Sequence, residues 1–341
     1  MSEWTPPTDW TRVTAIDSHT AGEPFRVVAA GVPKIPGETM LAKRQHAEAQ
    51  LDHLRRVLML EPRGHADMYG CFLTQPVTPG AAFGALFLHN DGFSTMCGHG
   101  IIALATVATT VGLVPTTPPE TTLVIDTPAG PVTAVATHAE VGIASVRFQN
   151  VPSFLAARDH SVNVPGLGSV RYDLAYGGAF YAFVEADAVG LVLSPANVGA
   201  LKEAGMAIKQ AVAGKGPIEH PSATDLGFLY GTIFVGPAED PANHSRQVCI
   251  FADGQVDRSP TGTGVSARVA MLSARGRLAL EEPISVESIL GTTFVGRALS
   301  ETSVGPHEAV VPQVEGAAFI TGRHEFLVDP RDPLRHGFLV R

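Results

Sequence analysis

The sequence predicts an α/β (α+β) fold in which one structural unit occurs twice. Three observations support this prediction. A glycine-rich motif appears twice, about half the chain apart. Each copy opens a stretch that is apolar almost all round, as expected of a helix buried at the centre of a domain. The 35 Gly and 26 Pro among 341 residues indicate many turns, which suits a strand-rich fold.

The repeat aligns Met96–Ala103 with Pro260–Ala267, so that Cys97 corresponds to Thr261. An Asp-Gly turn precedes each motif, at Asp91 and at Asp253, and strand-like runs follow both. We therefore expect two domains. Residues 1–152 with 322–341 form the first and carry Cys97, and residues 153–321 form the second and carry Asp257 and Thr261.

The two motifs are expected to begin the central helices. Ser259 is a suitable N-cap with Pro260 at the first helical position, and Thr95 is the aligned N-cap. Cys97 and Thr261 would then lie in the first helical turn, where backbone N–H groups have no helical acceptor. Gly112 and Gly276 stand where left-handed C-terminal caps are expected.

The remaining elements follow from hydrophobic periodicity. Residues 39–60 and 195–212 are predicted as surface helices. Six strands are predicted, over residues 13–16, 27–30, 85–89, 146–151, 180–185 and 248–251.

Composition restricts the function classes. With 24 Lys+Arg against 33 Asp+Glu, the formal charge of −9 argues against a nucleic-acid partner. No apolar run reaches the ~20 residues that span a bilayer, and the start of the chain lacks the pattern of a secretory signal. Three widely spaced cysteines fit reduced thiols. We expect a cytoplasmic protein with no nucleic-acid or membrane partner.

Cys97 is the leading catalytic candidate. A helix N-terminus favours a thiolate, so we expect the Cys97 pKa to lie below its ordinary ~8.5 and the sulfur to act as a base. Gly98 and Gly100 allow a ligand to approach the backbone, and Gly262, Thr263 and Gly264 form a matching cradle. Two facing helix N-termini could enclose a small anion.

Other interpretations stay open at this point. Cys97 could be a packing residue, and Asp257 a solvated turn residue. Cys97 with His99 could bind a metal, but no second Cys/His pair stands at ligand spacing, so we expect no metal. A Cys–His hydrolase requires His99 to activate Cys97, and residues two apart at a helix start are expected to point in different directions. Cys71 and Cys249 are interpreted as structural.

Residues 96–100 and 257–264 resemble the two signature motifs of the proline racemase family. Residues 17–24, the pair His89-Asn90 and residues 177–181 also match its pattern. The resemblance implies a diaminopimelate-epimerase-like fold. In that fold two similar domains each have a curved, mostly antiparallel sheet around a central helix, and the site lies between the domains.

In the racemases and epimerases of this family both motifs carry a catalytic Cys, whereas here the second position is Thr261. This Cys/Thr pair is similar to that of the trans-3-hydroxy-L-proline dehydratases. The resemblance then implies cofactor-independent conversion of that substrate to Δ1-pyrroline-2-carboxylate and water. Cys97 would accept the α-proton, with Thr261 opposite it.

The resemblance also implies binding roles. Gly98, His99, Gly262 and Thr263 would bind the substrate, mostly through its carboxylate, and Asp257 would pair with the ring ammonium. His220 is a further candidate for the lining. The alternatives are a 4-hydroxyproline epimerase or proline racemase-type isomerase, and a non-catalytic amino-acid binder. A homodimer is the assembly left open.

Overall fold

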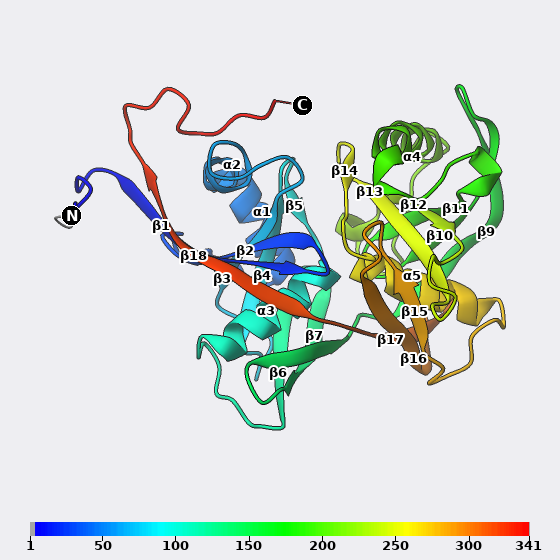
Figure 1. The fold of residues 1–341 in the computed structure, drawn as a ribbon, viewed down its shortest axis with the longest axis horizontal. Coiled ribbons are helices and arrows are strands. Elements are labelled where there is room, and N and C mark those ends of the chain that lie inside the picture. Colours follow the sequence, from blue (N-terminus) through cyan, green and yellow to red (C-terminus); the bar gives the residue numbers. More distant parts are fainter. Residues whose placement is uncertain (1–3, 341) are drawn as a thin grey trace.

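The computed structural model describes residues 4–340, and residues 1–3 and 341, which belong to the ends of the predicted first domain, lie outside it. Figure 1 shows two lobes side by side, with both ends of the chain at the first. The first lobe contains β1 (Thr11–Thr20), β2 (Glu23–Ala30), α1 (Met40–Gln50), α2 (Asp52–Met59), β3 (Tyr69–Thr74), β4 (Phe83–His89), β5 (Phe93–Ser94), α3 (Gly98–Thr110), β6 (Glu120–Thr127), β7 (Gly130–His138), β8 (Ile143–Gln149) and β18 (Ala318–Val328).

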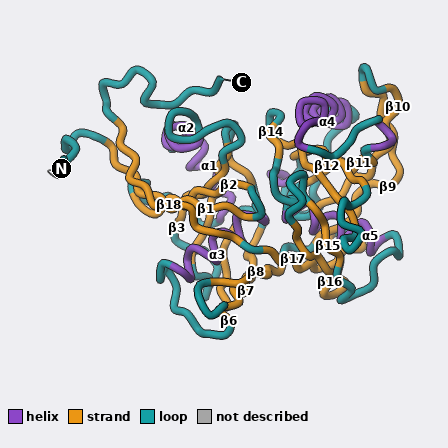
Figure 2. Tube along the Cα trace, in the orientation of Figure 1, coloured by secondary structure: helices purple, strands orange, loops and turns teal. Residues whose placement is uncertain are grey.

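The second lobe contains the intervening elements. They are β9 (Ser153–Val164), β10 (Gly168–Tyr176), β11 (Phe180–Glu185), α4 (Val198–Ala213), β12 (Leu229–Gly236), β13 (Ser245–Phe251), β14 (Gln255–Val256), α5 (Gly262–Ala274), β15 (Ile284–Glu287), β16 (Thr293–Val304) and β17 (His307–Gly316). Figure 2 shows that strands dominate both lobes, with α2 and α4 at the outside.

The predicted duplication extends to the strand connections. In the first lobe β2 and β3 are parallel neighbours joined through α1 and α2, and in the second β11 and β12 are parallel neighbours joined through α4. The strands β3–β4 and β12–β13 are then antiparallel, and β4–β6 and β13–β15 are parallel. The same unit therefore occurs twice, and its sheet is mostly antiparallel, as predicted.

The sheets of the two lobes are continuous. In the second lobe β9 pairs with both β10 and β17, which closes the strands into a barrel-like ring. The strand β17 also pairs with β8 of the first lobe, and the chain then runs on into β18, which pairs with β1. Figure 1 shows the chain passing from β17 in the second lobe to β18 in the first. The domain boundaries at residues 152/153 and 321/322 stay a prediction.

Each lobe is built around one buried helix. Residues Gly98 to Thr109 of α3 are all buried, as are Gly262 to Leu272 of α5. The helix α3 packs against β1, β7, β8 and β18, and α5 packs against β9, β10, β16 and β17. The predicted central helices are confirmed, and so are their left-handed caps, with φ +74° at Gly112 and +64° at Gly276.

The predicted helix starts are wrong by two residues. Cys97 and Thr261 are themselves the N-caps, because Cys97 is extended (φ −142°) and Thr261 is left-handed (φ +63°). The Cys97 sulfur accepts a hydrogen bond from the Gly100 N–H and so takes the place of a capping oxygen. Ser259 instead accepts a hydrogen bond from the Thr261 N–H, ahead of the helix.

The outer helices differ in two respects from the prediction. The helix expected over residues 39–60 is broken at Leu51 into α1 and α2, which lets the apolar residues of both helices reach one cluster against the sheet. The helix expected over residues 195–212 begins as a 3₁₀ turn and continues as α4. All six predicted strands are present, in β1, β2, β4, β8, β11 and β13, but the one expected over residues 146–151 ends at Gln149. Within residues 4–340, every helix is too short or too polar to cross a bilayer.

Candidate active site

The N-termini of α3 and α5 meet backbone to backbone between the two lobes. A Cβ atom added at Gly98 would lie 2.5 Å from the Gly262 Cα, and one added at Gly262 would lie 2.7 Å from the Gly98 Cα. No side chain fits at either position. Two positive helix ends thus converge on one point, an arrangement that favours a bound anion.

A small cavity lies at this point, with a volume of about 20 Å³. That is room for about one water molecule, so the site is closed in this structure. Its walls come from both lobes: Tyr69, Met96, Cys97, Gly98 and His99 from the first, and Tyr181, Tyr230, Cys249, Phe251, Asp257, Thr261, Gly262 and Thr263 from the second. The catalytic pair and the five binding residues that the sequence predicted all line it together.

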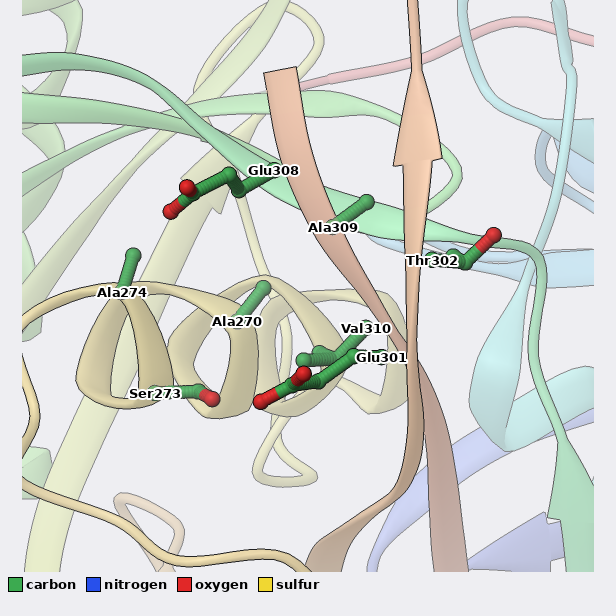
Figure 3. A pocket seen from close by; sticks show the side chains of 8 residues that line it. All are labelled: Ala270, Ser273, Ala274, Glu301, Thr302, Glu308, Ala309 and Val310. Carbon is green, nitrogen blue, oxygen red and sulfur yellow. The ribbon is translucent and has the colours of Figure 1, made fainter.

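His220 does not line this cavity. It borders a separate cavity of about 390 Å³ with Tyr176 and Ser222, and its ring packs 4.7 Å from that of Tyr176. A further cavity of about 240 Å³, drawn in Figure 3, lies between α5 and the β16–β17 hairpin. Neither the predicted catalytic pair nor the five predicted binding residues line either of these cavities.

The Cys97 thiol is almost fully buried at the cavity wall. Burial raises the Cys97 pKa well above its ordinary value, and the negative charges of Asp257 and Glu23 act the same way. The hydrogen bond from the Gly100 N–H opposes this increase but is the smaller effect. The expected decrease in the pKa is therefore wrong, because desolvation of the thiolate outweighs the effect of the helix N-terminus.

His99 lies beside Cys97, contrary to the expected divergence. Its Nδ1 is 3.3 Å and its Nε2 3.5 Å from the Cys97 sulfur. If the sulfur were hydrogen-bonded in the plane of the ring, it would lie much farther from one ring nitrogen than from the other. The two similar distances therefore place the sulfur against the face of the His99 ring, and not on the axis of either nitrogen lone pair. Burial lowers the His99 pKa to about 4, so the ring is neutral at pH 7.

Asp257 is a buried residue of the cavity and not a solvated turn residue. Its Oδ1 accepts a hydrogen bond from the Ser259 N–H, and its Oδ2 lies 4.0 Å from His99 Nδ1. The next N–H, that of Arg258, donates to the fully buried Glu23 of the first lobe at 2.7 Å. Burial raises the Glu23 pKa well above its ordinary value, and the Asp257 charge adds to the increase. This side of the cavity therefore concentrates carboxyl groups.

Thr261 faces the cavity from the second lobe. Its left-handed φ of +63° is unusual for a β-branched residue and indicates local strain of the kind found at functional sites. Within residues 4–340, its buried hydroxyl makes no hydrogen bond of good geometry. It lies close to Cys249, whose pKa burial raises well above its ordinary value, with the Thr261 contact acting in the opposite direction.

Sequence reasoning missed an aromatic layer that covers the cavity. Tyr69 pairs with His89 across β3 and β4, and Tyr230 directly precedes Gly231, which pairs with Phe251 across the equivalent strands β12 and β13. Their ring centroids lie between 5.4 and 6.3 Å apart. The repeat alignment, carried upstream of the Asp-Gly turns, pairs His89 with Phe251 but sets Gly231, and not Tyr230, against Tyr69.

Among the described residues, no group of three or more His, Cys, Asp or Glu side chains is placed to share a metal ion.

Comparison with known proteins agrees with the motifs. The sequence profile described as proline racemase matches residues 15–339. A trans-3-hydroxy-L-proline dehydratase from Colwellia psychrerythraea is 44% identical over 344 residues, covering 100% of this chain and 97% of the relative. A 3-hydroxyproline 2-epimerase from Burkholderia multivorans is 47% identical over 329 residues, covering 96% of this chain and 98% of the relative.

Among solved structures, a hydroxyproline epimerase from Agrobacterium vitis with bound trans-4-hydroxy-L-proline superposes with a TM-score of 0.93. It is 33% identical, and the match covers 98% of this chain and 96% of that chain. The similarity spans nearly the whole sequence and confirms the predicted fold class. The chain belongs to the proline racemase family.

Proposed function

We propose that the protein is a hydro-lyase that converts trans-3-hydroxy-L-proline to Δ1-pyrroline-2-carboxylate and water, with Cys97 as the base. One observation carries the proposal: the two-fold related N-cap positions hold a thiol, Cys97, on one side of the cavity and a hydroxyl, Thr261, on the other. A threonine hydroxyl neither ionises nor donates readily near pH 7, so this pair supplies one base and no equivalent acid opposite it.

The binding roles follow from the charges around the cavity. The N–H groups of Gly98, His99, Gly262 and Thr263 lie in the first turns of α3 and α5 and hold the substrate carboxylate. The ring ammonium pairs with Asp257. It also neutralises part of the charge that raises the Cys97 pKa, so substrate binding itself favours the thiolate. Because the cavity is only about 20 Å³ in volume, enough for about one water, the lobes must separate to admit the substrate.

The proposed reaction takes place on one face of the substrate ring, the face toward Cys97. Cys97 removes the α-proton, the 3-hydroxyl departs, and the resulting enamine tautomerises to the cyclic imine. In the trans isomer the hydroxyl lies opposite the carboxylate, and so it shares a ring face with the α-hydrogen and with Cys97. Elimination is therefore syn.

A second candidate function is epimerisation at Cα. The observation that favours it is Cys249, a buried thiol that lines the cavity from the second lobe beside Thr261. It could protonate the face opposite Cys97. The name of the Burkholderia relative points the same way.

Initial rates with the two 3-hydroxy-L-proline isomers test the proposal. We expect Δ1-pyrroline-2-carboxylate from the trans isomer, formed at least about 100-fold faster than from the cis isomer, the usual contribution of one well-placed acid or base. Equal or faster loss of water from the cis isomer would contradict the single-base mechanism. Thermal stabilisation by the substrate with no product would indicate a binding protein.

A further inference from the structure

Three buried hydroxyls form a short chain at the cavity wall. The Tyr69 hydroxyl is hydrogen-bonded to the Ser94 hydroxyl and, at 3.1 Å, to the Tyr230 hydroxyl. Tyr69 is 3% exposed and Tyr230 8%, and both line the cavity that holds Cys97. The Tyr69–Tyr230 bond joins β3 of the first lobe to β12 of the second.

The three hydroxyl groups have one hydrogen more than their two mutual hydrogen bonds require. Each hydroxyl carries one hydrogen, and the two bonds consume two of the three. Within residues 4–340, these hydroxyls make no other hydrogen bond. If Ser94 and Tyr230 both donate to the central Tyr69 oxygen, they occupy its two lone pairs. The Tyr69 hydrogen is then left to point at a further acceptor.

Tyr69 stands on the side of the cavity where the substrate hydroxyl is expected. It belongs to the first lobe, as Cys97 does, and its ring centroid lies 5.0 Å from that of His99. Burial raises the Tyr69 pKa well above its ordinary value, and a negative charge on Cys97 is close enough to raise it further. The phenol is thus neutral at pH 7 and holds a proton that it can donate. Tyr230 belongs to the second lobe, as Thr261 does.

We propose that Tyr69 recognises the 3-hydroxyl of the substrate and donates its phenolic proton to that oxygen as the C3–O bond breaks. This inference rests on the proposed dehydration. When Cys97 accepts the α-proton, the C–H electron pair forms the C2–C3 double bond. The C3–O electron pair stays on the oxygen, which leaves as water with the Tyr69 proton. The Cys97 thiol afterwards returns one proton to the phenolate, so the net loss is one water. Hydrogen bonds from Ser94 and Tyr230 stabilise the phenolate as it forms.

The test compares two leaving groups in the Tyr69→Phe variant. Fluoride leaves without needing a proton, so trans-3-fluoro-L-proline bypasses the proposed donor but still requires Cys97. We expect Tyr69→Phe to slow water loss from trans-3-hydroxy-L-proline by at least about 100-fold. Fluoride release should stay within a few-fold of the wild type, which also shows that the variant is folded. Tyr176→Phe is the matched control, because it removes another buried phenol that lies outside this cavity; it should change neither rate.

Equal slowing of both reactions would show that Tyr69 only positions the substrate, and unchanged water loss would show that it is not the donor. A larger and selective loss of dehydration in Tyr230→Phe would move the role to Tyr230. Each of these results overturns the inference while leaving wild-type dehydration intact. A wild-type enzyme that releases neither water nor fluoride instead contradicts the proposed function.

Discussion

Gly98 and Gly262 touch across the two lobes, and each leaves no room for a Cβ atom on the other. Such an atom at Gly98 would come within 2.5 Å of the Gly262 Cα, and one at Gly262 within 2.7 Å of the Gly98 Cα. This contact sets how closely the N-termini of α3 and α5 approach, and hence where the Cys97 sulfur stands relative to Thr261. The closed site therefore depends on two residues whose side chains carry no chemistry.

Gly98→Ala is expected to hold the lobes apart and to lower turnover by about 100-fold, the usual cost of misplacing reacting groups by about 1 Å. Gly199→Ala is the matched control. Gly199 lies in α4 with open space around its Cα, so alanine should leave turnover unchanged and stabilise the helix by up to about 1 kcal/mol. Steady-state kinetics and thermal unfolding of both variants check this. Near-normal turnover in Gly98→Ala would mean that this close contact is not needed for catalysis.

Cys97→Ser should reduce turnover to below about 1% of wild type, because a hydroxyl at the same position is far too weak a base. The serine oxygen can still accept the hydrogen bond from the Gly100 N–H, so the fold should be kept. Substrate should still raise the melting temperature. If substantial activity survived in a folded variant, the base would have to be another group.

Thr261→Cys should restore a symmetric pair of thiols and introduce epimerisation of a proline-type substrate. The motivation is that Thr261 and Cys97 are the N-caps of equivalent helices. Chiral chromatography of the recovered amino acid measures the result. No inversion in a folded variant would show that the surroundings of Thr261, including its left-handed backbone, separate the two activities as much as the thiol does.

Stability should fall as the pH drops below about 6.5, because two histidines are buried in neutral form. Burial lowers the His99 pKa to about 4 and the His89 pKa to about 3, against an unfolded value of 6.5. Between these pH values the unfolded chain therefore binds more protons than the folded chain. For each such histidine, the free energy of unfolding falls by up to about 1.4 kcal/mol for every unit by which the pH drops. The contribution of both groups is complete above about pH 6.5.

His89→Phe isolates one of these groups, since phenylalanine already stands at the equivalent position, Phe251. Urea unfolding between about pH 8 and about pH 5 should show a shallower loss of stability in the variant. The difference at the upper pH measures the change in packing together with the loss of the hydrogen bond from the Asp91 N–H to His89 Nδ1. The same pH dependence in both proteins would show that His89 is not buried neutral.

Much of the fold follows from the sequence, because the repeated glycine motif marks both helix starts and both lobes. The exact N-caps do not follow, since Cys97 caps with sulfur and Thr261 adopts a conformation that only its tertiary surroundings can impose. The direction in which the Cys97 pKa shifts could not be predicted from the sequence either. It depends on how completely two separate lobes exclude water from the thiol, which local motifs do not encode.

Part of the candidate site can likewise be predicted from the sequence, and part of it cannot. Cys97, Asp257 and Thr261 stand in motifs that are recognisable along the chain. Tyr69 and Tyr230 are far apart in sequence and meet only in the folded structure. No local sequence pattern predicts the hydrogen bond between their hydroxyl groups.

The most direct test of the single-base account is the fate of trans-3-hydroxy-L-proline incubated with the wild-type protein in D₂O. The reaction is stopped at partial conversion, and both the product and the Cα configuration of the remaining substrate are measured. The account predicts that Δ1-pyrroline-2-carboxylate accumulates while the recovered substrate keeps the L configuration. Accumulation of the Cα epimer, cis-3-hydroxy-D-proline, without loss of water would contradict it.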